Sequence, residues 1–317
     1  PKTKKTQRPS TNKVTMHRLV DNGDEVVAML LKHRATLKLK TSFTSPLARF
    51  ARDGILYPET RTVSTVTGRF SMAGPNLQQI PKRGPVGKAI RRCLTSPDSS
   101  GITACDYGQV ELRVAAAMSK EPILLEAFNA GRCPHREVAG KMLGKRPDNI
   151  TEDERFKAKA VNFGILNGMG AKRLAIDLKS TKPFAQRFLD EYLTNLNVLH
   201  EWMEGVWRNA EAYRIVRNAG GRTRIFSNND DTRPAISMEV QGTAAEIMRK
   251  ALVAADGAGL NPLLSVHDEL LIGGTDERKA RELQEVMENA ANNAFPAELG
   301  AVCFTAEATH GATWGDV

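Results

Sequence analysis

Two short apolar runs, each followed by an aspartate, form the most informative pattern in the chain. Residues 102–105 precede Asp106, and residues 263–266 lie just before Asp268. Apolar runs of this length predict buried strands. A carboxylate at the end of a buried strand is costly unless its charge is compensated. Taken singly, each acid is equally well explained as a turn cap. If the two strands are neighbours, the two carboxylates lie close together, and a divalent cation would compensate their combined negative charge.

Helical periodicity dominates the middle and later parts of the chain. The apolar spacing predicts helices over residues 109–119, most of 121–217, 235–256 and 276–294. One apolar stripe is typical of a helical core face and contains Phe184, Phe188, Tyr192, Leu199, Met203, Val206 and Trp207. A last strand is expected near residues 302–308. Helices combined with an antiparallel hairpin around Asp268 predict the α+β class.

The first hundred residues have a different character. Residues 1–40 are basic, with a helical pattern that begins near Val14, whereas glycine and proline break residues 41–101 into short extended pieces. A basic run of this kind is either a solvated arm or a segment that follows phosphates.

A second unusual pattern lies between the two aspartates. Arg155, Lys159, Phe163 and Asn167 are spaced by four and therefore share one face of a helix. A stripe of two cations, an aromatic ring and an amide is unusual for a core face and for a solvated face. It suits a nucleoside triphosphate, with phosphates on the cations and the sugar and base toward Phe163. The alternative is a basic helix packed through Phe163, with both cations in solvent.

The order of these segments resembles the polymerase core of a family A DNA polymerase, the class of bacterial DNA polymerase I. The resemblance is carried by Asp106-Tyr107-Gly108-Gln109-Val110-Glu111-Leu112-Arg113, by residues 155–168 and by Val266-His267-Asp268-Glu269. Further stretches agree, namely Thr65-Val66-Thr67-Gly68-Arg69-Phe70, residues 75–81, Val240-Gln241-Gly242-Thr243-Ala244-Ala245-Glu246, and residues 38–40 with 42–47. The match extends from about residue 38 to the C-terminus.

The resemblance implies a right-hand polymerase architecture with an antiparallel-sheet palm and an all-helical fingers insertion. We expect a basic partial thumb or arm at 1–42, palm at 43–120, helical fingers at 121–229 and the second part of the palm at 230–317. The implied activity is template-directed addition of deoxynucleotides to a primer 3′ end by two-metal nucleotidyl transfer.

The same resemblance implies roles for individual residues. Asp106 and Asp268, with the carbonyl of Tyr107, would bind two Mg²⁺ ions, for which Mn²⁺ is a substitute. Lys159 would meet the charge on the leaving pyrophosphate and give it a proton. Arg155 and His135 would hold the outer phosphates, and Gln109 would also contact the triphosphate. For His135 alone, a structural role is the alternative.

Two residues are expected to read the sugar. Glu111 matches the family's acid that excludes a 2′-hydroxyl, which favours DNA synthesis over RNA synthesis. Phe163 would pack beneath the sugar ring, and the resemblance implies discrimination against dideoxynucleotides that Phe163→Tyr would relax.

Primer-template contacts involve another set of residues. Positions that resemble those touching the minor groove near the new base pair are Arg69, Asn76, Gln78, Gln241 and His267, and Asn167 would lie near the templating base. Arg222 and Arg224 are either clamps on the DNA backbone or part of a solvated hairpin. Asn167 departs from the usual tyrosine and lacks its aromatic face, so altered fidelity or lesion tolerance is expected. The family commonly has serine at the position of Gly108, and the missing side chain casts little doubt on the expected activity.

Composition supports a nucleic-acid partner. Lys and Arg number 45 and Asp and Glu 36 among 317 residues, a formal net charge of +9. The four cysteines show neither disulfide nor zinc spacing. Without an apolar stretch of membrane-spanning length or a signal peptide, we expect no membrane association and a cytoplasmic location, in the nucleoid or a host cytoplasm, with an organelle left open.

The expected partners are primer-template DNA and deoxynucleoside triphosphates. No segment for a 3′–5′ exonuclease is visible, and the thumb is short, so low processivity is expected unless a separate exonuclease or thumb chain, or a processivity factor, completes the enzyme. The rival hypotheses are a non-catalytic nucleic-acid-binding module and a metal-dependent nuclease. Replication and repair remain equally open as biological tasks.

Overall fold

A computed structural model of the chain describes residues 8–82 and 84–317. The chain divides into two compact units. The first comprises Pro1–Thr60 and Met72–Ile90, and the second comprises Arg61–Ser71 and Arg91–Val317. Among the described residues, no helix is both long and apolar enough to cross a membrane.

The first ninety residues form short elements after two helices. In chain order these are α1 (Lys13–Asp21), α2 (Glu25–Leu39), the π-helical turn η1 (Lys40–Thr44), α3 (Ser45–Phe50), β1 (Ala51–Arg52), β2 (Ile55–Leu56), β3 (Glu59–Arg61), β4 (Ser71–Ala73), the 3-10 turn η2 (Leu77–Gln79) and α4 (Pro85–Arg91). Strand β1 pairs with β2, and β3 pairs with β4. The turn-rich character predicted for residues 41–101 is confirmed, except that α3 and α4 are helical. Proline near the first turn of each explains this, because its fixed φ suits a helix start.

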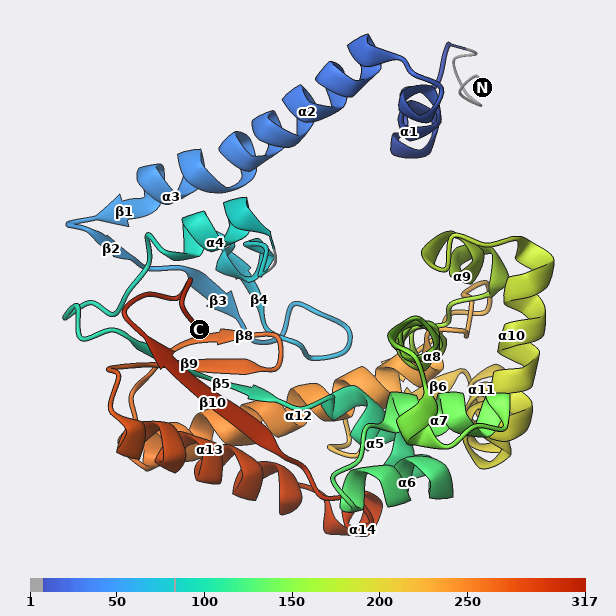
Figure 1. Cartoon of the computed structure of the whole chain (residues 1–317). Coiled ribbons are helices and arrows are strands. Elements are labelled where there is room, and N and C mark those ends of the chain that lie inside the picture. The colour runs from blue at the N-terminus through green and yellow to red at the C-terminus, as the bar shows by residue number, and fades with distance from the viewer. Residues whose placement is uncertain (1–7, 83) are drawn as a thin grey trace. The chain divides into compact units, whose positions relative to one another are not determined.

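The second unit is built on a four-stranded antiparallel sheet with the order β10-β5-β9-β8. Its strands are β5 (Ile102–Tyr107), β8 (Pro262–Val266), β9 (Glu269–Gly273) and β10 (Ala306–Gly311). Helices α12 (Ala235–Gly257) and α13 (Glu277–Asn292) pack against each other and against this sheet (Figure 1). The Tyr107 hydroxyl donates to the carbonyl of Met287 on α13 at 2.6 Å, which places the Tyr107 side chain on the helix-covered face.

The last strand begins later than predicted. Residues 302–308 were expected to form it, but β10 starts at Ala306 and continues to Gly311. The reason is that side chains replace the strand partners of the preceding residues. The main-chain N–H of Cys303 donates to Asn129 Oδ1 at 3.0 Å, and that of Phe304 donates to Asn292 Oδ1 at 2.8 Å.

Helices fill most of the chain between β5 and α12, as predicted. They are α5 (Val110–Ser119), α6 (Pro122–Asn129), α7 (Pro134–Leu143), the 3-10 turn η3 (Pro147–Asn149), α8 (Glu152–Leu166), α9 (Ala171–Asp177), α10 (Lys182–Asn195) and α11 (Asn197–Tyr213). A short hairpin of β6 (Ile215–Arg217) and β7 (Thr223–Ile225) follows, and α14 (Pro296–Leu299) lies before β10. The α+β class predicted from the sequence is confirmed.

The expected core stripe is confirmed in its centre and wrong at one end. Tyr192, Leu199 and Met203 are almost fully buried. Phe184 is 37 % exposed instead, stacked on Phe188 with ring centroids 6.1 Å apart. Its position in the first turn of α10 explains the exposure, because the helix end extends past the packed core.

Candidate active site

The two predicted acidic strands are neighbours in the sheet. Strand β5 pairs with β9, and Asp106 lies directly opposite Glu269. Asp268 occupies the turn between β8 and β9, and the N–H of Tyr107 donates to its carbonyl at 3.1 Å. The turn places His267 in the left-handed region at φ 56°, which is uncommon for residues other than glycine, although histidine is enriched there. The structure therefore brings the Asp106 and Asp268 backbones together, as the sequence predicted.

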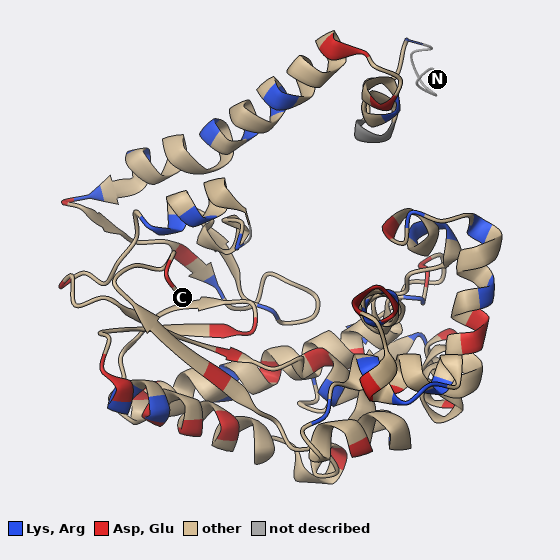
Figure 2. Cartoon of the chain, in the orientation of Figure 1, with Lys and Arg blue, Asp and Glu red and all other residues tan. Residues whose placement is uncertain are grey.

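Three acids lie in a row on the face of the sheet that points away from α13. Asp106 is flanked by Glu269 on β9 and by Glu307 on β10. Directly opposed residues of antiparallel strands point to the same face, with Cβ atoms about 5 Å apart. Because Tyr107 points to the helix-covered face, these three point away from α13. Figure 2 shows the acidic segments on the strands. Sequence reasoning missed Glu307, although the alternation of Ala306 and Ala308 with polar residues is its signal.

Arg69 lies between two acids, Glu111 and Asp268. Its guanidinium hydrogen-bonds Glu111 and lies 3.9 Å from Asp268 Oδ1. The Glu111 side chain is only 11 % exposed, so its carboxylate is held by a partner. Burial raises the pKa of Asp268 to about 6; Glu111 and Asp106 add to the rise and Arg69 opposes it. Excess negative charge at this turn is therefore only partly compensated by the protein.

The donor set of this region fits a hard divalent cation. The carboxylates of Asp106 and Asp268 and the main-chain oxygens of β5 are all oxygen donors, which Mg²⁺ and Mn²⁺ prefer. Within the described part of the chain, no three His, Cys, Asp or Glu side chains converge as a metal site. A cation here would thus take further oxygens from water or a ligand, as Mg²⁺ bound to a phosphate does.

Two arginines hold the loop that carries Arg69. Arg249 donates to the carbonyl of Gly68 at 2.5 Å and also to that of Thr62. Arg222 lies so close to Gly68, which has φ +81°, that a Cβ there would meet its side chain at 2.4 Å. Arg222 also pairs with Glu246 on α12 at 3.1 Å. The arginine predicted as a DNA clamp is thus engaged within the protein, and Arg249, which positions the loop, had no signal in the sequence.

The turn after Asp106 orients Gln109. This residue caps α5 with φ 57°, and its side-chain oxygen is buried with no hydrogen-bond partner among the described residues. A buried amide oxygen without a partner is uncommon in native proteins and often marks a functional position. Arg113 fixes the turn by donating to the carbonyl of Gly108 at 2.7 Å and to Thr305 Oγ1 at 2.8 Å. Arg113 was part of the recognised motif but received no role from the sequence.

Helix α8 presents the predicted stripe. A capping box between Thr151 and Glu154 begins the helix. Arg155 lies 2.9 Å from Glu152, one turn earlier, and Lys159 Nζ is 5.7 Å from the centroid of the Phe163 ring. The two cations and the ring are therefore on one face, where the partly exposed Arg155 pairs with the exposed Glu152.

His135 is deeply buried, which disfavours the charged form of its ring. It is 2 % exposed on α7, and its ring lies 5.8 Å from that of Phe163. Burial, with Lys159 and Arg155 nearby, lowers its pKa to about 4, so the ring is neutral at pH 7. The amide nitrogen of Asn162 lies 2.7 Å from Nδ1, which leaves the proton on Nε2. The histidine can thus offer an N–H, and its expected phosphate contact remains a prediction.

The other predicted DNA contacts fall into different environments. Asn167 ends α8, donates to the carbonyl of Phe163 at 2.8 Å and accepts a hydrogen bond from Gln241 on α12. Arg224 lies over the ring of Phe226 at 4.5 Å. Asn76 and Gln78 belong to the first unit, where Asn76 caps η2.

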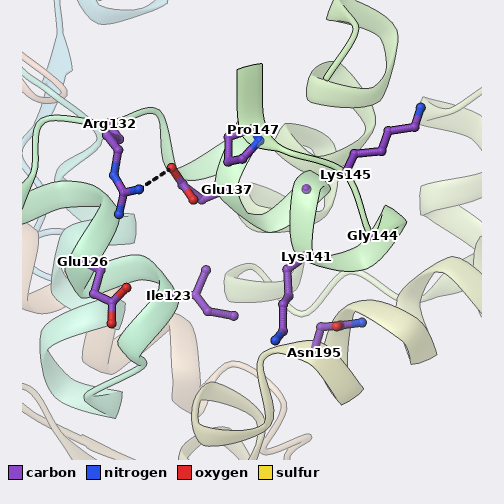
Figure 3. A pocket seen from close by; sticks show the side chains of 10 residues that line it. Ile123, Glu126, Arg132, Glu137, Lys141, Gly144, Lys145, Pro147 and Asn195 are labelled. Carbon is purple, nitrogen blue, oxygen red and sulfur yellow. Dashed lines mark ion pairs between the residues drawn. The ribbon is translucent and has the colours of Figure 1, made fainter. Parts of the chain in front are cut away.

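A pocket of about 600 Å³ lies on the other side of α7. Glu137, Gly140, Lys141 and Gly144 line it, with Glu126 on α6 and Asn195 on α10 (Figure 3). Arg132 and Glu137 form an ion pair of 3.2 Å at its edge. The lining residues of α7 recur at three- and four-residue spacing on the face opposite His135. The pocket therefore contains none of the predicted site residues.

Comparison with known proteins agrees with this arrangement. The family model described as DNA polymerase family A matches residues 1–316. The thermostable DNA polymerase I of Thermus aquaticus is 34 % identical over 316 residues, covering 94 % of this chain and 38 % of that protein. DNA polymerase I of Pseudomonas aeruginosa is 31 % identical, covering 98 % of this chain and 36 % of that protein. The chain thus spans less than two fifths of the length of these relatives.

A solved structure is similar over the whole chain. The POL domain of Pol1 from M. smegmatis, in complex with DNA primer-template and dNTP, has a TM-score of 0.87 and 29 % identity. The match covers 100 % of this chain and 58 % of that one. With the family model matching nearly every residue, the chain belongs to DNA polymerase family A.

Proposed function

We propose that this chain is a template-directed DNA polymerase that adds deoxynucleotides to the 3′ end of a primer. The observation that carries the proposal is the pairing of β5 with β9, with the Tyr107 N–H bonded to the Asp268 carbonyl at 3.1 Å. This pairing puts two carboxylates at one edge of a rigid sheet. Membership of DNA polymerase family A supports the same conclusion.

In the proposed reaction, the primer 3′-oxygen attacks the α-phosphorus of the incoming nucleotide. A new P–O bond forms, the bond to the bridging oxygen of the β-phosphate breaks, and pyrophosphate leaves. Two divalent cations, Mg²⁺ or Mn²⁺, would supply charge stabilisation at the attacking and leaving oxygens. Asp106 and Asp268 would hold them, with the Tyr107 carbonyl as a third protein oxygen.

The residues of α8 and α7 would act on the triphosphate. Arg155 and Lys159 supply positive charge along one face of α8, and Lys159 Nζ would give a proton to the departing pyrophosphate. The neutral ring of His135 would donate its Nε2–H to a phosphate oxygen. The buried, unpartnered side-chain oxygen of Gln109 would accept a hydrogen bond from the bound nucleotide or its water.

The choice of sugar is assigned to Glu111. Its carboxylate is nearly buried and bonded to Arg69, so an additional 2′-hydroxyl would find little space beside it. A relative solved with primer-template and dNTP supports the assignment of these ligands. Primer-template DNA would meet Arg69, Gln241, His267, Asn76 and Gln78. An exonuclease, thumb or processivity partner on another chain stays a prediction.

A nuclease or a non-catalytic binding module fits less well. Either could use two acids on adjacent strands or a basic surface. Neither needs an arginine, a lysine and a phenylalanine on one helix face together with a carboxylate held by an arginine. These features match recognition of a triphosphate and its sugar.

The test is extension of a labelled primer-template with Mg²⁺ and the four deoxynucleotides. We expect template-directed extension by the wild type and at least a ~10³-fold loss in Asp106→Asn, because removal of a metal ligand removes charge stabilisation in the transition state. Asp256→Asn, an exposed acid at the end of α12, serves as the matched control and should retain activity. Duplex binding without extension by the wild type would support the binding module, and primer shortening would support the nuclease.

A further inference from the structure

The two consecutive acids of the β8–β9 hairpin have different arginine partners. Asp268 lies 3.9 Å from Arg69, and the side chains are 29 % and 32 % exposed. Glu269 lies 3.8 Å from Arg91, and those side chains are 6 % and 5 % exposed. A partly exposed pair exchanges its partner for a cation more readily than a buried pair, which cannot separate without leaving a charge in a desolvated place.

Arg91 is held on its other side by the C-terminal segment. Its guanidinium lies over the ring of Trp314, 3.9 Å from the centroid, and Trp314 is 1 % exposed. The main-chain N–H of Trp314 donates to the carbonyl of Leu94 at 2.8 Å. Burial lowers the pKa of Arg91, and the charge of Glu269 opposes that change. The arginine thus remains a fixed positive charge between the hairpin and the tail.

The location of Glu269 gives this contact a consequence for chemistry. Glu269 is directly opposite Asp106 in the sheet and adjacent in sequence to Asp268. On the same face of the sheet, it would be a third carboxylate within reach of any cation bound there. Its carboxylate instead lies 3.8 Å from the buried guanidinium of Arg91.

We propose that Arg91 is a positioning residue that holds the Glu269 carboxylate away from the catalytic cations and so limits the carboxylate ligands to Asp106 and Asp268. A third carboxylate would bind the cation more tightly and would occupy a position that a substrate phosphate oxygen needs. The inference rests on the proposed function only in that it assigns the cations to Asp106 and Asp268.

The test compares wild type, Arg91→Met, Glu269→Gln and the double variant. The first readout is Mn²⁺ binding by electron paramagnetic resonance, which needs neither DNA nor activity. We expect Arg91→Met to bind Mn²⁺ about 5- to 10-fold more tightly, because it removes a nearby positive charge and frees a carboxylate. The double variant should return to within about twofold of wild type, since the freed carboxylate is then an amide.

The second readout is primer extension. In Arg91→Met we expect kcat to fall about 30-fold with the KM for deoxynucleotide changed by less than about threefold, and the double variant to recover most of the loss. Arg92→Met is the matched control, because this neighbour is 64 % exposed and pairs with Asp316 at 3.4 Å, away from the hairpin acids. It should leave both readouts unchanged.

The outcomes separate the proposal from its alternatives. A purely structural arginine would give weaker or unchanged Mn²⁺ binding, with no rescue by Glu269→Gln, and would overturn the proposal. Loss of Mn²⁺ binding in Glu269→Gln alone would make Glu269 a ligand and would also overturn it. If Arg91→Met does not fold, Arg91→Lys keeps the charge and should keep wild-type Mn²⁺ affinity, whereas tighter binding by this variant would contradict the role of the charge. Mn²⁺ binding that follows the expected pattern without polymerase activity in the wild type would refute the proposed function alone.

Discussion

The palm sheet and helix α8 hold their charges in different ways. At the sheet, acids are fixed by strand pairing and by arginines that lie partly or wholly inside the protein, as with Glu111 and Arg69. On α8, Arg155 is held by Glu152, which is 70 % exposed, and Lys159 lies beside the Phe163 ring and has no carboxylate partner among the described residues. The acids of the sheet thus have partners fixed by the fold, whereas the two cations of α8 that we propose to bind a nucleotide have weak or exposed partners.

The largest effect expected on α8 is that of Lys159. We expect Lys159→Met to lower kcat for nucleotide addition about 10²-fold, the usual range for loss of a general acid, and therefore less than the loss from Asp106→Asn. Single-turnover extension measures the chemical step directly. Lys157→Met is the control on the same helix, because Lys157 pairs with Asp153 at 2.6 Å and lies off the stripe. A loss equal to that of the metal acid would contradict the difference between the two regions.

The next effect tests whether the palm arginine fixes the sugar-reading acid. We expect Glu111→Ala to reduce discrimination against ribonucleotides at least ~10-fold, because it opens the space that Arg69 keeps filled with a carboxylate. The measurement is the ratio of kcat/KM for a deoxynucleotide and its ribonucleotide. Glu111→Gln keeps the size of the side chain and should retain most of the discrimination. Unchanged discrimination in the alanine variant would show that another group reads the sugar.

The same contrast explains what the sequence could predict. Asp106, Asp268 and the α8 stripe follow from local patterns, an apolar run before each acid and a four-residue repeat, and the structure places them as expected. Strand neighbours also follow, because two buried acids favour a common compensation. The environments of these groups depend on distant segments and had no local signal.

Arg91 and Arg249 illustrate that limit. Arg91 meets Glu269 across 178 positions of the chain and stacks on Trp314, whereas Arg249 supports a loop that ends near Gly68. Nothing in the residues around either arginine distinguishes it from a solvated cation. Arg222, expected either to clamp DNA or to belong to a solvated hairpin, pairs with Glu246, and its contact with DNA stays a prediction. Pairing of this kind is decided by tertiary packing.

A smaller effect is expected where the two regions meet. Asn167 at the end of α8 accepts a hydrogen bond from Gln241 on α12, in place of the aromatic face of a tyrosine. We expect Asn167→Tyr to lower the misincorporation frequency about threefold, because a ring can pack against the templating base. Misincorporation kinetics opposite each template base measure this. Asn195→Tyr, at the end of α10, controls for a new surface ring, and equal error rates in wild type and Asn167→Tyr would reject the idea.

The smallest effect concerns Glu239, a carboxylate of α12 for which no arginine partner like Arg69 or Arg91 is found among the described residues. Burial raises its pKa to about 7 from the ordinary 4.5. A raised pKa means that the folded state favours the protonated form, so this contribution to stability is full below pH 4.5 and is lost as the pH rises through 7. Glu239→Gln should therefore match wild type near pH 4.5 and be more stable by about 1–2 kcal/mol at pH 8, where solvent reaching the half-buried group reduces the full linkage value.

Urea unfolding at the two pH values measures this difference. Glu201→Gln, an exposed position on α11, is the control and should show no pH-dependent gain. A Glu239→Gln variant less stable than wild type at pH 8 would mean that the ionised carboxylate has a favourable partner, as Glu269 has in Arg91. The expected gain would instead show that the ionised Glu239 on α12 has no compensating charge. By contrast, Glu269 on β9 has the buried Arg91 beside it, and a partner of this kind makes a buried acid tolerable.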